Sequence, residues 1–125
     1  MAMQPLATRV SRQGELAVIA LAGDVDGAAD TTLTAAFDEA VAGSPARLLL
    51  DFGDVVYINS TGIALIVGLL GRARAERIDL AACGLLDHYR EIFEITRLSD
   101  FMRIFPDERA AVADAAPGTT EEVTG

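Results

Sequence analysis

Residues 55–64 read VVYINSTGIA, and this short stretch organises the rest of the chain. Six of the ten residues are apolar or aromatic, but the polar trio Asn-Ser-Thr at 59–61 interrupts them before Gly62. An apolar pattern at helical spacing starts at Ile63, so the trio joins a loop to a predicted helix. Each member of the trio is a favoured helix N-cap, because its side-chain oxygen accepts from free backbone N–H groups. A cap explains one polar residue and leaves two without a structural reason.

On both sides of this junction, short strand-like segments alternate with longer helix-like segments. Short apolar or alternating runs predict strands at 6–10, 15–22, 47–52, 78–83 and 101–105. Runs with apolar residues at helical spacing predict helices at 29–42, 63–77, 86–97 and 107–116. The first two strands form a hairpin, and strands and helices alternate after it. The pattern predicts an α/β fold with a mixed, mostly parallel sheet of about five strands and about four helices.

The length of 125 residues suits a single domain, which we place at 1–116, followed by a flexible tail at 117–125. The longest uncharged stretch, 55–71, contains the polar trio and three glycines, so it is a poor membrane span. The first 13 residues lack the apolar core of a signal peptide. We therefore expect a cytoplasmic protein that does not insert into membranes.

The charge pattern excludes several functional classes. Net charge is −9, and all ten basic residues are arginine. An acidic chain with scattered arginines is unsuited to nucleic-acid backbones, and the lack of lysine removes P-loop and Schiff-base chemistry. The lone histidine, His88, and the single Cys83 give no metal-ligand spacing, so we expect no cofactor or metal. Cys83 is predicted to be a small buried side chain in a strand.

Three motifs in order resemble the STAS-domain family of anti-sigma factor antagonists. The stretch VVYINSTGIALIVGLL is similar to the family signature of an apolar residue, Asp-Ser-Ser-Gly and an apolar helix. The segment Gly-Asp-Val-Asp at 23–26 resembles the Gly-x-x-Asp turn after the second strand. The closing segment IFEITRLSDFMRIFPDERAAV resembles the last helices and strand. Together the resemblance covers about residues 6–115 and implies a single STAS-type domain.

The resemblance implies a non-enzymatic protein that works by partner switching. Its expected partner is an anti-sigma factor that is also a serine kinase of the histidine-kinase-like ATPase type. The unphosphorylated form would bind this kinase and free the sigma factor, phosphorylation of Ser60 would break the complex, and a serine phosphatase would reset it. By position, Ser60 is the phosphoacceptor. The residues expected to contact the partner are Asp24, Asp26, Tyr57, Ile58, Asn59, Thr61 and Gly62.

One position departs from the signature, because Asn59 stands where the family usually has aspartate. Asparagine keeps the capping oxygen but adds no negative charge beside the acceptor. We interpret this as a tuned kinase preference. Without phosphorylation, the protein would act by constitutive binding, as a stressosome-like scaffold or as a regulatory subunit of a lipid transporter.

Two further alternatives start from single residues. A hydrolase could use Ser60 with His88, but no Gly-x-Ser-x-Gly elbow surrounds the serine. The aspartates at 24, 26 and 30 could bind magnesium with Asp51 as in a phosphorelay receiver, although ordinary turn chemistry explains them. His88 and Tyr89 are expected on the surface or in contact with a partner. Two glycines inside the helix at 63–77, Gly68 and Gly71, predict close packing against a neighbouring element.

Overall fold

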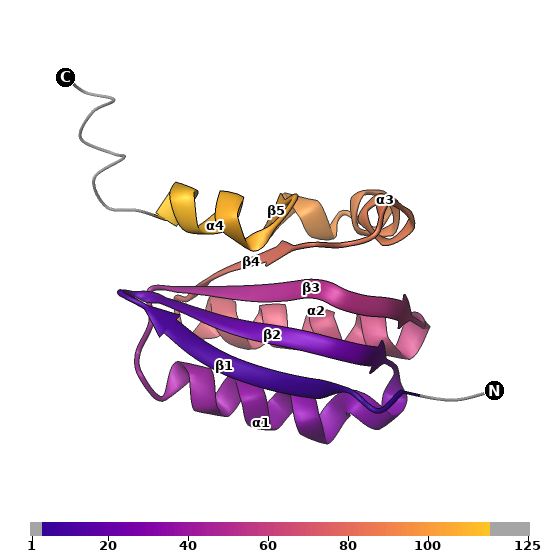
Figure 1. Cartoon of the computed structure of the whole chain (residues 1–125), viewed down its shortest axis with the longest axis horizontal. Coiled ribbons are helices and arrows are strands. Elements are labelled where there is room, and N and C mark those ends of the chain that lie inside the picture. Colours follow the sequence, from indigo (N-terminus) through magenta and orange to yellow (C-terminus); the bar gives the residue numbers. More distant parts are fainter. Residues whose placement is uncertain (1–3, 116–125) are drawn as a thin grey trace.

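The computed structural model describes residues 4–115, which form a five-stranded sheet with helices on both faces (Figure 1). The strands are β1 (Ala7–Gln13), β2 (Leu16–Val25), β3 (Arg47–Ile58), β4 (Asp79–Cys83) and β5 (Arg103–Phe105). The helices are α1 (Asp30–Val41), α2 (Ser60–Ala75), α3 (Asp87–Ile95) and α4 (Glu108–Ala115), with 3-10 turns η1 (Gly27–Ala29) and η2 (Leu98–Asp100). The predicted α/β class and element order are confirmed, whereas the predicted tail at 117–125 lies outside the described residues.

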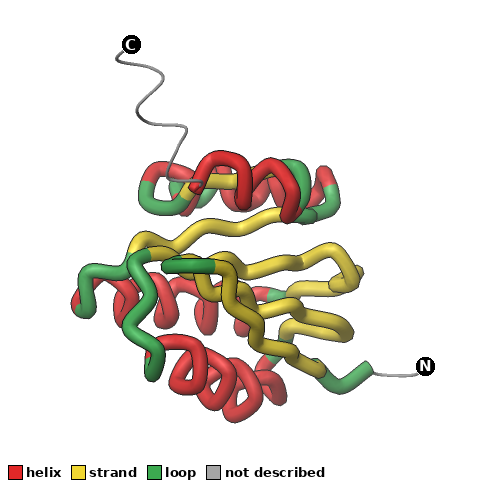
Figure 2. Tube along the Cα trace, turned by 60° about the vertical axis from the view of Figure 1, so that its left-hand side comes forward, coloured by secondary structure: helices red, strands yellow, loops and turns green. Residues whose placement is uncertain are grey.

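The strands lie in the sheet in the order β1-β2-β3-β4-β5 (Figure 1), and Figure 2 shows the sheet in yellow between the helices in red. β1 pairs antiparallel with β2, and every later pair is parallel. Parallel neighbours end at the same edge of a sheet, and the segments that follow them meet there. The turn after β2 and the start of α2 after β3 are therefore neighbours in space.

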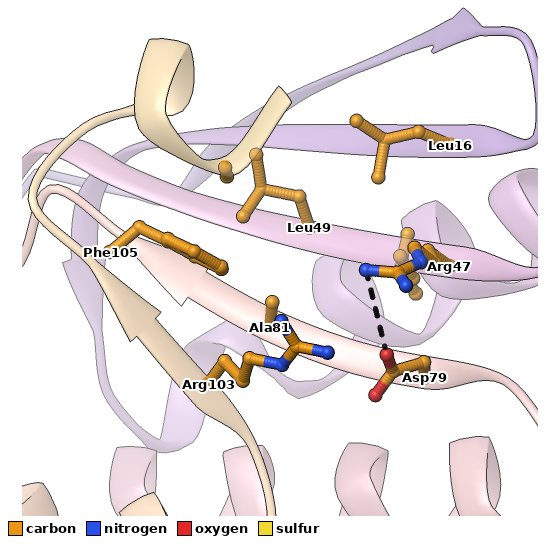
Figure 3. Close-up of a pocket in the computed structure, with 9 residues that line it drawn as sticks. Leu16, Arg47, Leu49, Asp79, Ala81, Arg103 and Phe105 are labelled. Atoms are coloured by element: carbon orange, nitrogen blue, oxygen red, sulfur yellow. Dashed lines mark ion pairs between the residues drawn. The ribbon is translucent and has the colours of Figure 1, made fainter. Parts of the chain in front are cut away.

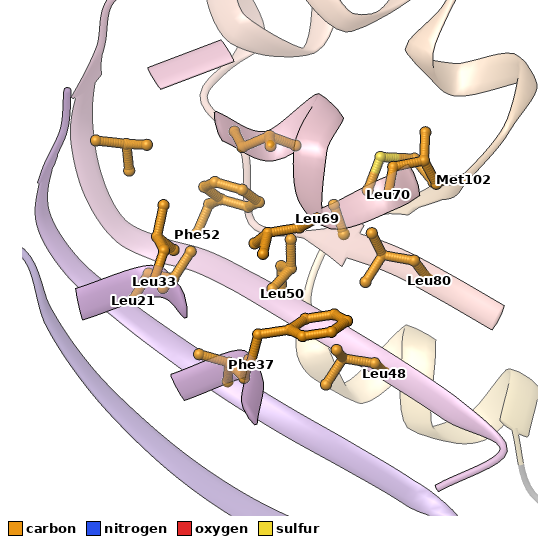
Figure 4. Packing of buried hydrophobic residues seen from close by; sticks show 14 of the residues in the cluster. Leu21, Leu33, Phe37, Leu48, Leu50, Phe52, Leu69, Leu70, Leu80 and Met102 are labelled. Carbon is orange, nitrogen blue, oxygen red and sulfur yellow. The ribbon is translucent and has the colours of Figure 1, made fainter. Parts of the chain in front are cut away.

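Alternation along the strands divides the apolar side chains between two faces. The larger cluster lies under α1, α2 and α3, where Phe37, Leu50 and Phe52 are fully buried (Figure 4). The rings of Phe52 and Phe93 meet edge to face with centroids 6.1 Å apart, which ties β3 to α3.

The opposite face carries a smaller cluster that only α4 covers within residues 4–115, and its members include Leu16, Leu49 and Cys83. Burial of Cys83 is as predicted. Figure 3 shows this face around a cavity of about 20 Å³, where Arg47 lies 3.9 Å from Asp79. The space is sufficient for little more than one water molecule, so it offers no ligand site.

Two strands continue beyond their predicted ends. β2 runs to Val25 and β3 to Ile58, through segments predicted to be a turn and a loop. These extensions pair with each other, with two register shifts at which β3 carries an extra residue, so backbone pairing overrides the glycines and aspartates in both. Because β3 ends at Ile58, α2 begins at Ser60 rather than near Ile63.

Candidate functional site

The predicted site forms where β2 and β3 end side by side. Asp24 lies opposite Tyr57 and Val25 opposite Ile58 in the parallel register. The N–H of Asn59 then donates to the carbonyl oxygen of Val25 at 3.2 Å, which continues the pairing by one residue. This bond brings the turn after β2 against the start of α2.

Asn59 is the member of the polar trio that caps α2. Its backbone is extended, with φ −102° and ψ −177°, and its Oδ1 accepts from the N–H of Gly62 at 2.8 Å. Its carbonyl oxygen accepts from the N–H of Ile63 at 2.9 Å, which closes the first turn of the helix. The cap is thus complete without a hydroxyl group, and both hydroxyl residues that follow are available for another purpose.

Ser60 is the first residue of α2, and its side chain is exposed. Its hydroxyl group makes no hydrogen bond to any other residue in the range 4–115. The neighbouring Thr61 is also exposed, but its methyl group faces Gly27, where a Cβ would lie 3.4 Å from it. The two hydroxyl residues therefore differ: Thr61 lies against the turn after β2, and Ser60 projects freely.

Gly62 allows the helix start to approach the strand end. A Cβ at this position would lie 2.0 Å from the carbonyl oxygen of Val25, which is far inside van der Waals contact. Only glycine fits without moving backbone. Gly62 is buried, so its expected partner contact is corrected: it shapes the surface without contributing a side chain to it.

The two aspartates of the turn have separate local roles. Asp26 is 8% exposed, and its Oδ1 accepts from the N–H of Ala28 at 3.0 Å, which caps η1. Asp24 is partly exposed, and its Oδ2 accepts from the N–H of Gln4 at 3.1 Å. Neither carboxylate is hydrogen-bonded to Ser60. Asp24 is accessible to a partner, whereas Asp26 acts mainly through the shape of the turn.

The last residues of β3 present a mixed surface. Val56 is 68% exposed and Tyr57 is 45% exposed, so both apolar side chains face solvent beside the helix start. Ile58 is only 6% exposed and packs in the main core, which corrects its predicted role as a partner contact. Val56 is not among the residues expected to contact the partner, although it stands between Val55 and Tyr57 in the stretch 55–64.

Tyr89 of α3 contacts the end of β3 from the core side. The prediction of a surface residue is wrong, because Tyr89 is buried and its hydroxyl oxygen accepts from the N–H of Ile58 at 3.0 Å. Its spacing of four residues from the buried Phe93 was the available signal for an inward position. His88 is exposed, its ring lies 5.0 Å from that of Tyr89, and no hydrogen bond in residues 4–115 joins it to Ser60.

Within residues 4–115, neither a metal site nor a reactive cysteine is found at this edge of the sheet. Residues 4–115 contain no group of three His, Cys, Asp or Glu side chains that could hold a metal ion. Burial raises the pKa of the Cys83 thiol, and the neighbouring Asp51 raises it further, so this cysteine is protonated and unreactive. None of the helices described is long and apolar enough to cross a membrane.

A family model described as the STAS domain matches residues 7–111. The anti-sigma-B factor antagonist of Listeria monocytogenes is 39% identical over 57 residues, which are 46% of this chain and 50% of that protein. BtrV of Bordetella bronchiseptica is 37% identical over 70 residues, which are 56% of this chain and 58% of that protein. The matches therefore span only about half the length of these relatives.

Solved structures match over much more of the chain. An anti-sigma factor antagonist from Mycobacterium paratuberculosis has a TM-score of 0.75 at 20% identity, over 87% of this chain and 92% of that one. SpoIIAA in its unphosphorylated form has a TM-score of 0.66 at 20% identity, over 87% and 97% of the two chains. The phosphorylated form of the Bacillus protein SpoIIAA gives 0.69 at 20% identity, over 88% and 100%. At these identities the likeness is one of fold.

Proposed function

The chain belongs to the STAS domain family, and from this membership we propose that it is an anti-sigma factor antagonist controlled by phosphorylation of Ser60. In its unphosphorylated form it binds an anti-sigma factor with serine kinase activity, and the sigma factor is released. Phosphorylation ends this binding, and a serine phosphatase restores it. The protein acts by binding and catalyses no step itself.

One observation carries the proposal: Asn59 caps α2, so the hydroxyl group of Ser60 remains free at the helix N-terminus. A serine that caps a helix must keep its oxygen on a backbone N–H. Ser60 does not need to cap the helix, since Asn59 Oδ1 already accepts a hydrogen bond from the N–H of Gly62 at 2.8 Å. A kinase can therefore engage the Ser60 hydroxyl without uncapping α2.

The chemistry needs only a hydroxyl group from this chain. The Ser60 oxygen attacks the γ-phosphorus of ATP, and an O–P bond forms as the bond from that phosphorus to the bridging β–γ oxygen breaks. ADP leaves, and the serine proton passes to a base or to solvent on the kinase side. The kinase supplies ATP and its metal ion.

A phosphate on Ser60 should leave the fold intact and prevent binding of the partner. It would bring about −1.5 to −2 charges to a helix N-terminus, where unpaired N–H groups and the helix dipole favour an anion. The end of β3 that precedes it carries exposed Val56 and Tyr57, which suit a desolvated interface. A dianion inside such an interface would be desolvated without a cation, and a penalty of about 3 kcal/mol would weaken binding more than a hundredfold.

Two similar proteins support the proposal. The Listeria relative is an anti-sigma-B factor antagonist, and its 39% identity covers 46% of this chain. SpoIIAA has been solved in unphosphorylated and phosphorylated forms, and both resemble this fold. The likeness supports a fold that accommodates a phosphate without large rearrangement.

The direct test is the phosphorylation state of the protein recovered from its own cells. We expect a substoichiometric phosphate by intact-mass spectrometry, mapped to Ser60 by fragmentation of the single tryptic peptide 48–72. It should vanish in Ser60→Ala and persist in Thr61→Val, the matched control that removes the neighbouring hydroxyl. The unphosphorylated protein should capture a serine kinase that the phosphorylated form does not.

The alternative is constitutive binding in a scaffold or transporter-associated complex. Asn59 favours it, because a neutral cap lacks the acidic charge usual beside the acceptor. The fold also resembles a sulfate transporter family protein from Wolinella succinogenes, with a TM-score of 0.73 at 16% identity, over 84% of this chain and 88% of that one. Absence of phosphate under every growth condition, with a partner that binds Ser60→Asp as well as the unmodified protein, would establish this alternative.

A further inference from the structure

A groove runs along the outer side of α2, between this helix and the segment 96–101. Its volume is about 410 Å³, and most of its lining is apolar. The wall that α2 contributes consists of Ile63, Val67, Leu70, Gly71 and Arg74. Their spacing of three and four residues places them on one face of the helix. Ile66 and Ala73 on the buried face of α2 pack in the main core, and Leu70, which is 6% exposed, belongs to both that core and this wall.

Two large apolar side chains stand open at the groove. Val67 on α2 is 46% exposed, and Phe101 on the opposite wall is 54% exposed. Within residues 4–115 both side chains remain open to solvent, although the guanidinium of Arg74 lies over the Phe101 ring. An open apolar channel with aliphatic and aromatic walls is the kind of surface that receives the apolar face of an amphipathic helix.

The glycines of α2 are a second, independent indication that a partner packs against this helix. Gly68 and Gly71 lie inside the helix and are exposed. Close packing within the chain was the expected reason for them, and this expectation is wrong: a Cβ at either position would meet nothing within 4 Å. Each glycine makes α2 less stable than alanine would, with no compensation inside the described fold. Bare backbone on an exposed helix allows a partner backbone to approach closely.

The groove also has a cation at its far end. The guanidinium of Arg74 lies 5.4 Å from the centre of the Phe101 ring. In the part of the chain that the structure describes, Arg74 pairs with no carboxylate, whereas neighbouring Arg72 pairs with Asp38 at 2.9 Å. The guanidinium of Arg74 is thus available to a carboxylate from outside this part of the chain. It selects an occupant with an acidic residue at the corresponding end.

From the groove, the glycines and Arg74 we infer that this face of α2 binds an amphipathic α-helix of a partner protein. The apolar face of that helix covers Val67 and Phe101, its backbone lies close to Gly71, and an acidic side chain meets Arg74. From Ile63 to Arg74 the wall is about 17 Å long, which matches roughly three turns of helix. A second copy of this chain is a poor occupant, because each copy carries the same net charge of −9.

This site is separate from the proposed phosphorylation switch. The near end of the groove, at Ile63, lies about 4.5 Å from Ser60 along α2, but Arg74 lies about 21 Å away, and charges are largely screened beyond about 8 Å at physiological ionic strength. The ionic contact at Arg74 should therefore not depend on the charge at residue 60, and the near end of the groove is apolar. The inference stands even if Ser60 is never phosphorylated.

The test uses the full chain and a phage library of helical peptides of about 12 residues, randomised at apolar and charged positions on an alanine-based scaffold. We expect selected peptides to share apolar residues at spacings of three, four and seven and an acidic residue near one end. Fluorescence anisotropy should give a loss of at least roughly tenfold for Gly71→Leu, which fills the groove. Arg74→Ala should weaken binding roughly two- to fivefold.

Matched controls separate this result from general effects. Ala75→Leu adds the same side chain to an exposed position of α2 outside the groove lining, and Arg90→Ala removes an exposed arginine from α3. Both variants, and Ser60→Asp, should bind selected peptides within about twofold of the unmodified chain, which is the effect of a largely screened charge. Melting curves should show Gly71→Leu folded and at least as stable, since leucine is a better helix former than glycine.

Three outcomes would overturn the inference. The library could fail to enrich any sequence, or the enriched peptides could bind Gly71→Leu and Arg74→Ala as well as the unmodified chain. Sedimentation could also reveal a dimer that Val67→Asp dissociates, which would assign the groove to a second copy. Binding that Ser60→Asp abolishes would merge the groove with the switch surface and refute its independence.

Discussion

The hydroxyl oxygen of Tyr89 in α3 accepts a 3.0 Å hydrogen bond from the backbone N–H of Ile58, the last residue of β3. β4 cannot provide this acceptor, because its final residue, Cys83, pairs with Asp51, seven residues before the end of β3. The buried phenol therefore completes the strand at the point where the chain turns into the candidate site. Residues far apart in sequence thus fix the position of Asn59 and Ser60.

Replacing Tyr89 with phenylalanine should destabilise the protein although the ring is retained. The N–H of Ile58 would remain buried without an acceptor, which costs about 1–3 kcal/mol. Urea denaturation should report this loss in the free energy of unfolding. Tyr57→Phe is the control, because Tyr57 is 45% exposed and water can replace its hydroxyl partner. Equal stability of the two variants would mean that the Tyr89 bond is not formed in solution.

Alanine should have opposite effects at two glycines of α2. Gly62→Ala would place a Cβ 2.0 Å from the carbonyl oxygen of Val25, and the resulting displacement should cost at least about 2 kcal/mol. Gly68→Ala meets nothing within 4 Å and should add up to about 1 kcal/mol, because alanine is the better helix former. Thermal unfolding monitored by circular dichroism measures both changes. A stable Gly62→Ala variant would contradict the close approach of α2 to β2.

Substitutions at Asn59 and Ser60 test which residue of the polar trio caps α2. Asn59→Ala removes the acceptor for the N–H of Gly62 and should cost about 1 kcal/mol. Asn59→Asp retains an acceptor and adds negative charge at the helix N-terminus, which is worth about 0.3–1 kcal/mol. We therefore expect the stability order Asp, Asn, Ala in denaturant titrations near neutral pH. Ser60→Ala should be nearly neutral in the same assay, and a loss comparable to that of Asn59→Ala would show that the serine caps the helix.

Glu108 should make stability depend on pH. Burial raises the pKa of its carboxyl group above the ordinary 4.5, a hydrogen bond with Asp51 and the charge of Asp51 raise it further, and Arg9 opposes the shift. A carboxyl group with a raised pKa in the folded state binds its proton more tightly there than in the unfolded chain. Its stabilising contribution is thus present below pH 4.5 and is lost as the pH rises through the folded value.

The corresponding variant is Glu108→Gln, which remains neutral at every pH. Urea titrations between about pH 4 and pH 7 should give a flatter dependence of the free energy of unfolding for this variant than for the unmodified chain. Glu91→Gln, at an exposed position of α3, is the control and should leave the pH dependence unchanged. A curve for Glu108→Gln that parallels that of the unmodified protein would contradict the proposed pairing with Asp51.

The sequence was sufficient for the fold class and for the segment that carries the site. Periodicity separated helices from strands, and the Asn-Ser-Thr-Gly junction marked the start of α2. The strand ends were missed because Gly23 and Gly53, each followed by aspartate, have the local chemistry of turns. Pairing between β2 and β3 continues past both glycines, and such tertiary pairing is invisible in a local pattern.

The roles of individual side chains in the site were harder to predict from the sequence. Asn, Ser and Thr are all good caps, so only the structure could assign the cap to Asn59 and leave Ser60 free. The inward position of Tyr89 was readable from its spacing to Phe93, but its hydroxyl partner lies 31 residues away. Gly62 was matched by its place in the motif, whereas its physical reason is the approach to Val25.

Strand order in the sheet equals strand order in the chain, and this has a consequence during protein synthesis. Each strand emerges from the ribosome after the neighbour on which it pairs, so the sheet can grow from β1 toward β5 as translation proceeds. Ser60 emerges long before Tyr89, which follows Ile58 by 31 residues, or roughly 2–6 seconds at 5–20 residues per second. A nascent chain thus exposes the serine before α3 has secured the strand behind it, and its recognition surface matures only when that helix is made.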